Sequence, residues 1–179
     1  MSARIVLLCE DRQLATFMRR FLKKRGWQPH DIREVIAPPG QGSGEQWVRE
    51  RYPLELAAAR SRGGLTLLAV GTDADTLSVA DRIATLDREC QAQGIPQRTP
   101  QEAVVMVVPK RNIETWFAYL RGESVNEEDV YPRYSNESDC RDDVRALDEM
   151  CRGGKLRDPA PPSLQVACSE YQKMPARNG

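Results

Sequence analysis

Residues 65–75 read LTLLAVGTDAD, an apolar run that passes through a glycine and ends in two closely spaced aspartates. A continuous apolar run bounded by glycines is typical of a β-strand that is buried on both faces, as in a parallel sheet. In open α/β sheets, ligands bind just outside the carboxyl ends of such strands. The sequence therefore puts Asp73 and Asp75 where a ligand would lie.

The spacing of Asp73 and Asp75 suggests a role for both carboxylates. One residue separates them, so on an extended chain they share a side, with Cα atoms roughly 6–7 Å apart. Two carboxylates this close repel each other unless a cation or a basic side chain lies between them. Hard oxygen ligands of this kind suit Mg²⁺ or Mn²⁺. The alternative is that both aspartates cap the next helix, a common position for Asp, and the loop alone leaves both interpretations open.

Apolar runs and helical periodicity alternate along the rest of the chain. Further strands are expected near residues 5–9, 33–37 and 103–108, with helical patterns between them at 14–25, 45–62 and 77–93. We expect a three-layer α/β fold with a mainly parallel, four-stranded, Rossmann-like sheet. Helices near 113–120, capped by Asn112, and near 139–151 and 163–171 follow the last strand. We therefore expect an α/β domain at 1–138 and a C-terminal helical extension at 139–179 packed on it.

Composition restricts the chemistry. The 179 residues contain 26 Lys and Arg against 26 Asp and Glu, so a polyanion would need a local basic patch. With one histidine, His30, any metal chemistry must rest on carboxylates. The five cysteines lack zinc-ligand spacing, and Cys9 and Cys90 read as core thiols of a reducing cytosol, which predicts a cytoplasmic protein. No apolar run approaches ~20 residues, so no membrane span is expected.

The ends of the other expected strands also carry polar or flexible residues. The first strand ends in Glu10 and Asp11, and the fourth in Lys110 and Arg111. The second runs into a loop with three alternating glycines: Gly40, Gly42 and Gly44. Such a loop lets backbone N–H groups approach an oxyanion, although it lacks the Lys-Ser/Thr ending of a P-loop and is equally readable as a flexible turn.

This order of strand ends resembles the Toprim fold, the metal-binding domain of topoisomerases, bacterial primases and OLD-type nucleases. The resemblance covers about residues 4–108 and implies that Glu10, Asp73 and Asp75 hold Mg²⁺ or Mn²⁺. Two features depart from the family. Residues 76–78 are TLS, whereas the topoisomerase motif continues as an acidic run. The first strand ends in Glu10 followed by Asp11, whereas Glu followed by Gly is a common form in the nuclease branch.

The resemblance implies a Mg²⁺-dependent nuclease that acts on DNA or RNA. Metal-assisted phosphodiester hydrolysis often uses two ions roughly 3.5–4 Å apart. Glu10 would be a metal ligand or the base that activates water, and Asp11 and Glu114 are candidates for a second metal site. The side chains that could neutralise phosphate charge, or else form ordinary salt bridges, are Lys110, Arg111 and Arg82.

Other interpretations remain open at this stage. Residues 110–119 resemble smaller bacterial Toprim-like proteins, some of which serve phage defence beside an ABC-type ATPase. That likeness implies an ATPase partner and an antiviral role, and the zero net charge favours a non-catalytic binding subunit of such a complex. Residues 5–11 also resemble the opening of a two-component receiver, a phospho-acceptor signalling domain. A receiver would carry its acceptor Asp in the middle fifties, where Glu55 lies in a helical run.

Overall fold

The computed structural model describes residues 4–62 and 65–173, and its centre is a parallel sheet of four strands. The strands are β1 (Arg4–Cys9), β2 (Ile32–Ile36), β3 (Thr66–Gly71) and β4 (Val104–Val107), in the order β2-β1-β3-β4. Each strand pairs in parallel with its neighbours. The predicted three-layer, Rossmann-like α/β fold is therefore confirmed.

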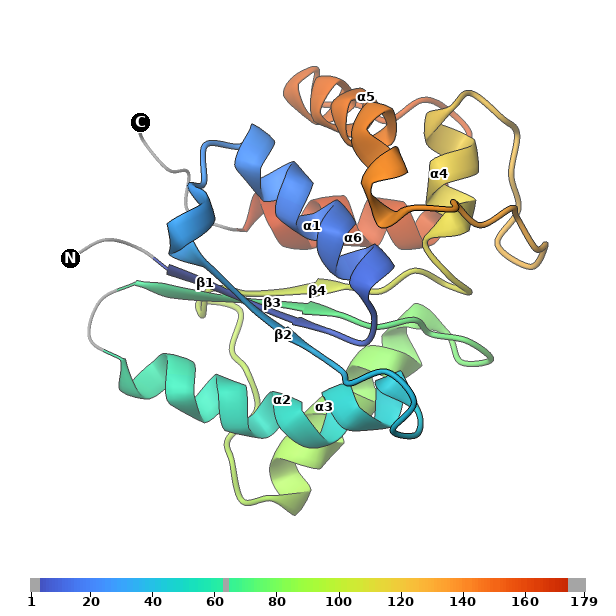
Figure 1. The fold of residues 1–179 in the computed structure, drawn as a ribbon. Helices are drawn as coiled ribbons and strands as arrows, with labels where there is room; N and C mark the ends of the chain where they lie inside the picture. Colours follow the sequence, from blue (N-terminus) through green and yellow to red (C-terminus); the bar gives the residue numbers. More distant parts are fainter. Residues whose placement is uncertain (1–3, 63–64, 174–179) are drawn as a thin grey trace.

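Six α-helices lie on the two faces of the sheet within the described residues. They are α1 (Arg12–Lys24), α2 (Gly44–Ser61), α3 (Val79–Ala92), α4 (Glu114–Leu120), α5 (Arg141–Arg152) and α6 (Pro162–Gln172). Two short 3-10 helices, Pro29–Asp31 and Glu137–Cys140, precede β2 and α5. In Figure 1, α1, α4, α5 and α6 cover one face and α2 and α3 cover the other. None of these helices is both long and apolar enough to cross a membrane.

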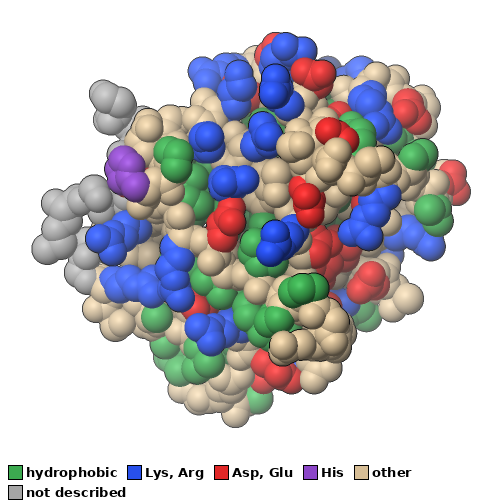
Figure 2. All heavy atoms as spheres, in the orientation of Figure 1, with side chains coloured by type: hydrophobic (Ala, Val, Ile, Leu, Met, Phe, Trp, Pro, Cys, Tyr) green, Lys and Arg blue, Asp and Glu red, His purple; other side chains and the backbone are tan. Residues whose placement is uncertain are grey.

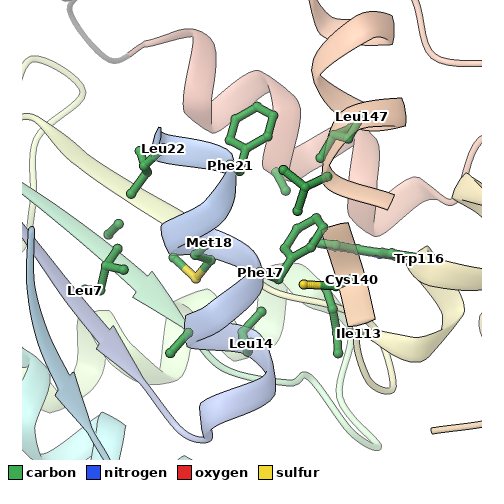
Figure 3. Packing of buried hydrophobic residues seen from close by; sticks show 14 of the residues in the cluster. Leu7, Leu14, Phe17, Met18, Phe21, Leu22, Ile113, Trp116, Cys140 and Leu147 are labelled. Atoms are coloured by element: carbon green, nitrogen blue, oxygen red, sulfur yellow. The ribbon is translucent and has the colours of Figure 1, made fainter. Parts of the chain in front are cut away.

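Alternate residues of the central strands point into two separate cores. Ile5 and Leu7 of β1 face the larger core, in which α1 contributes Phe17 and α4 contributes Trp116 (Figure 3). Val6 and the other intervening strand residues face the smaller core, built with α2 and α3. Because both faces of the sheet are covered, its central strands are apolar throughout, which is the pattern that residues 65–70 display.

The C-terminal helices belong to the larger core. Leu147 of α5 and Leu164 of α6 lie in the same apolar cluster as α1 and α4. The buried carboxylate of Glu170 ties α6 to the sheet, because it accepts hydrogen bonds from the Met106 backbone N–H at 3.1 Å and from Arg98 at 2.6 Å. Residues 141–173 are therefore integrated with the face of the sheet that also carries α1.

Candidate metal site

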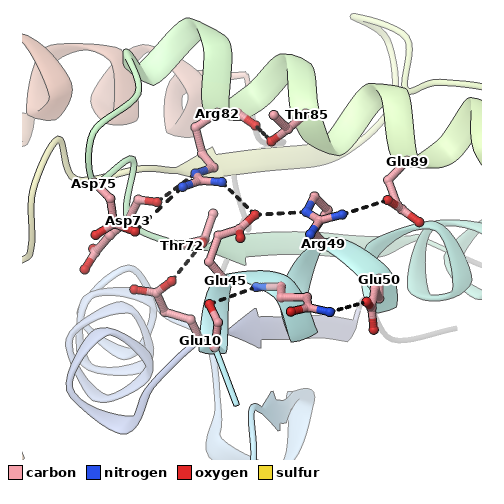
Figure 4. A network of polar contacts seen from close by, with 12 residues as sticks. Glu10, Glu45, Arg49, Glu50, Thr72, Asp73, Asp75, Arg82, Thr85 and Glu89 are labelled. Atoms are coloured by element: carbon pink, nitrogen blue, oxygen red, sulfur yellow. Dashed lines mark hydrogen bonds and ion pairs between the residues drawn. The ribbon is translucent and has the colours of Figure 1, made fainter.

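The register of β1 and β3 brings their following residues together. Cys9 lies opposite Gly71, so Glu10 and Thr72 leave the sheet side by side. The Glu10 backbone N–H donates to the Gly71 carbonyl at 3.1 Å, and the Thr72 hydroxyl donates to the Glu10 carboxylate at 2.8 Å (Figure 4). Glu10 is thus fixed at the carboxyl end of the sheet, next to Asp73.

Glu10 and Asp73 form a carboxyl pair. Their two carboxyl groups hydrogen-bond to each other. Burial is the main cause that raises the pKa of Glu10. Burial and then the negative charge of Glu10 raise the pKa of Asp73 to about 10. Closely placed carboxyls in a desolvated site favour the protonated form in this way.

Asp75 lies beside this pair but in a different environment. Its side chain is 57 % exposed, and its backbone has a φ of +55°, a region that Asp tolerates better than most residues. The nearest cation is the Arg82 guanidinium, whose Nη2 lies 3.7 Å from the Asp75 carboxylate. Asp75 therefore keeps a solvent-facing carboxylate next to the half-buried pair.

Arg82, a predicted substrate ligand, holds the loop that carries these aspartates. Its buried guanidinium donates to the carbonyls of Asp73 at 2.9 Å and Ala74 at 3.2 Å. It also forms an ion pair with Glu45 at 2.6 Å (Figure 4). The contacts of Arg82 in this structure are thus with the protein itself, and they fix the path of residues 73–75.

The alternative that Asp73 and Asp75 cap the next helix is wrong. The N-cap of α3 is Ser78, whose hydroxyl oxygen accepts from the Asp81 backbone N–H at 3.0 Å. Asp11, in contrast, is the N-cap of α1 and accepts from the Leu14 N–H at 2.8 Å. Among these acids, capping accounts for Asp11 and leaves Asp73 and Asp75 unexplained as structural residues.

A pocket of about 430 Å³ opens beside the carboxyl pair. The predicted site residues that line it are Asp11, Asp73, Asp75, Arg111 and Glu114. The other predicted site residues do not line it. Among them, Glu10 lies next to Asp73, which does line the pocket, and Lys110 donates to the backbone carbonyl of Asp75 at 3.1 Å. The pocket therefore gathers acids from three elements around one hollow.

The far wall of the pocket contains a residue that the sequence did not reveal. Arg133 pairs with Glu114 at 3.3 Å and lies 4.0 Å from the Asp11 carboxylate. Glu114 is buried at the start of α4, and burial raises its pKa. Arg133 lies in the irregular segment after α4. This segment has no sequence periodicity, so its position beside the pocket could not be predicted from the sequence.

The expectation that Asn112 caps α4 is wrong. The N-cap residue is Ile113, and no side chain completes the cap. Asn112 lines the pocket instead, with a buried Oδ1 that has no hydrogen-bond partner in the described part of the chain. A buried amide oxygen without a partner is unfavourable, so Asn112 has unused hydrogen-bonding capacity at the pocket wall.

Of the three predicted glycines, only Gly44 touches the site. Gly40 and Gly42 have positive φ and lie exposed in the loop before α2. Gly44 begins α2 directly against Glu10, and a Cβ there would lie 2.7 Å from the Glu10 carbonyl oxygen. Gly44 therefore allows α2 to start close to the carboxyl pair, and neither Gly40 nor Gly42 lines the pocket.

The donor chemistry of the pair suits a divalent cation. Hard carboxylate oxygens are the usual ligands of Mg²⁺, and two carboxyls in contact mark a point where positive charge is favourable. Among residues 4–62 and 65–173, no three His, Cys, Asp or Glu side chains already enclose such a point. The fit therefore rests on the pair itself, with Asp75 beside it and the pocket supplying space for water or a phosphate oxygen.

No protein-family model, curated protein or solved structure matches this chain. The function is therefore argued from the geometry of the site.

Proposed function

We propose that this chain is a Mg²⁺-dependent, Toprim-like nuclease that hydrolyses phosphodiester bonds of DNA or RNA. One observation carries the proposal: the half-buried carboxyls of Glu10 and Asp73 meet at the ends of two adjacent parallel strands, next to an open pocket. Strongly perturbed carboxyls in a cleft are characteristic of functional sites. The carboxyl ends of parallel strands are also where α/β folds bind ligands.

Glu10 and Asp73 would hold the cation, with Asp75 as the neighbouring ligand. A bound Mg²⁺ supplies charge stabilisation and a more acidic bound water to phosphate chemistry. The Thr72 hydroxyl orients the Glu10 carboxylate through its hydrogen bond. Arg82 holds the 73–75 backbone, so the two aspartates keep a fixed spacing.

The cations of the pocket would meet the substrate. Arg111 and Arg133 both line it and both have exposed side chains. Guanidinium groups bind phosphate oxygens through paired N–H donors, and they stabilise charge that develops during the reaction. Glu114, already paired with Arg133, is the candidate for a second metal position. Manganese would serve in place of magnesium because both prefer oxygen ligands.

The biological setting belongs to the same proposal. The likeness of residues 110–119 to small defence-associated proteins supports a cytoplasmic antiviral effector that acts with an ABC-type ATPase. The zero net charge is consistent with a protein that needs a partner to approach nucleic acid. Activity of the chain alone and in complex is therefore an essential comparison.

The test is cleavage of plasmid, single-stranded DNA and tRNA with Mg²⁺, Mn²⁺ or EDTA, with and without any ABC-type ATPase encoded next to this protein. We expect cleavage that requires the metal and is lost in Glu10→Gln. The matched control is Glu50→Gln, an exposed glutamate of α2. Metal-independent cleavage, or none in either setting, would overturn the nuclease proposal. The second outcome, combined with ATPase binding, would establish the non-catalytic subunit instead.

A further inference from the structure

A second pocket, of about 250 Å³, lies between α1 and α5 and is lined almost entirely by cations. We call it the basic pocket, and its lining residues are Arg20, Lys23, Lys24, Arg141 and Val144. In Figure 2, Lys and Arg side chains gather over the upper part of the face, where Figure 1 shows α1 and α5. Four cations therefore surround one hollow in a chain with no net charge.

These four cations differ from other cations of α1 and its C-cap. Arg19 pairs with Glu34 at 3.0 Å, and Arg25 contacts Asp148 at 3.5 Å. Within the described residues, none of the four basic-pocket cations forms an ion pair or donates a side-chain hydrogen bond. The Nε of Arg20 is also buried without a partner. Positive charge here is left uncompensated by the protein itself.

The basic pocket and the candidate metal pocket lie at opposite ends of α1. A third pocket, of about 400 Å³, shares Arg20 with the basic pocket and is also lined by Arg12. Arg12 directly follows Asp11, which lines the candidate metal pocket. From Asp11 to Lys24 the helix rises about 20 Å, which corresponds to several phosphate spacings of an extended strand. The three pockets are thus distributed along α1, from Asp11 before its first residue to Lys24 at its last.

We infer that the basic pocket binds the phosphodiester backbone of the nucleic acid whose scissile bond lies in the candidate metal pocket. The inference rests on the proposed function, because it assigns the path of that substrate. A chain of regularly spaced negative charges matches a row of unpaired cations, and phosphate contacts of this kind dominate nucleic-acid affinity. Glu34 does not cancel this charge because Arg19 pairs with it. Glu137, on the outer wall of the middle pocket, is exposed to solvent.

Lys23 and Lys24 are the residues to change, since both are exposed and contribute nothing to the core. Lys23→Gln/Lys24→Gln removes the charges, and Lys23→Arg/Lys24→Arg keeps them. The matched control is Arg62→Gln/Arg88→Gln, which removes two charges from α3 and the end of α2, on the other face of the sheet. Binding of labelled oligothymidylate and of a duplex is followed by anisotropy in EDTA, where no cleavage interferes.

We expect the Gln double variant to bind single strands roughly 20-fold more weakly at ~0.1 M salt, with a salt slope smaller by about 1.4, from two lost phosphate contacts. The Lys23→Arg/Lys24→Arg variant and the Arg62→Gln/Arg88→Gln control should bind like the parent. Equal binding by the parent and the Gln variant would overturn the inference, as would tighter binding of a polyglutamate peptide than of either nucleic acid.

The two proposals fail in different ways. Charge-dependent binding at the basic pocket without metal-dependent cleavage would support the proposed path of the nucleic acid and contradict the proposed nuclease activity. Metal-dependent cleavage that is unchanged in the Gln double variant at substrate concentrations below KM would support the nuclease while overturning the path.

Discussion

Two groups of acids lie close together at the carboxyl end of the sheet, and the protein treats them differently (Figure 4). Glu45 accepts from Arg82 at 2.6 Å and from Arg49 at 3.1 Å, and Arg49 continues to Glu89 at 3.1 Å. Glu10 and Asp73 have no ion pair within the described residues, and burial and their mutual contact raise both pKa values. Arginines thus compensate one group, while the other is left to an outside counter-charge.

The difference separates a structural network from a candidate functional one. A compensated acid stabilises the fold, whereas closely placed and desolvated carboxyls destabilise it unless a proton or a cation intervenes. Arg82 is near enough to touch the backbone of Asp73, yet its side chain is directed to Glu45. We infer that the uncompensated pair is retained for binding, and the experiments below test that contrast.

The largest expected effect is a loss of cleavage activity in the Asp73→Asn variant. Removing this group should lower the Mg²⁺-dependent rate by at least ~100-fold, since a catalytic metal supplies several kcal/mol. The unfolding free energy without metal should stay equal or rise, because the asparagine amide can donate to the Glu10 carboxylate. Glu89→Gln, in the compensated network, should retain the rate. Equal losses of rate and stability in Asp73→Asn and Glu89→Gln would contradict the distinction between the Glu10–Asp73 pair and the arginine-paired network.

Arg82→Met should have the largest effect on stability. The change leaves Glu45 with Arg49 alone and frees the carbonyls of Asp73 and Ala74. Breaking a buried ion pair in this way destabilises by about 3 kcal/mol, measured by urea unfolding. Arg82→Lys keeps the charge but cannot span all three partners, so we expect partial recovery only. A loss below ~0.5 kcal/mol, the usual surface value, would show that the network is not structural.

The pH dependence of stability should reveal the raised pKa of Asp73. Because burial and Glu10 raise the pKa of Asp73 in the folded chain, the folded state holds a proton that the unfolded state has released. In EDTA, this contribution to stability should therefore fall as pH rises from about 5 to 9. The measurement is urea unfolding across that range, and Asp73→Asn should flatten the curve. An unchanged slope in the variant would assign the pH dependence to other groups.

A smaller pH dependence of stability, of opposite sign, is expected from Glu102, an acid that is paired with an arginine. The hydrogen bond from Arg60, whose Nε lies 2.6 Å from the carboxylate, is the main cause that lowers the pKa of Glu102. Its stabilisation is present above the unfolded pKa and is lost as pH falls through the lowered folded value. Glu102→Gln should cost about 1 kcal/mol at neutral pH and almost nothing near pH ~2. A cost that persists in acid would point to packing.

The fold could be predicted from the sequence because its determinants are local. Apolar runs and helical periodicity indicated the four strands and the order of the helices, and adjacency of β1 and β3 then brought Glu10 to Asp73. The irregular segment after α4 gave no such signal, so Arg133 was missed. The Asn112 cap failed because α4 begins without a side-chain cap. Arg82 was placed at the site, but its ties to Glu45 and to backbone carbonyls depend on tertiary contacts that no pattern encodes.

The most direct test of the central claim is anomalous diffraction from crystals soaked in Mn²⁺, which replaces Mg²⁺ at oxygen sites. The claim is that a divalent cation binds between the carboxyls of Glu10 and Asp73. We predict an anomalous peak in contact with both carboxylates, absent from crystals of Asp73→Asn. Well-ordered parent crystals that show no peak there, with the two carboxyls still hydrogen-bonded to each other at saturating Mn²⁺, would contradict the account.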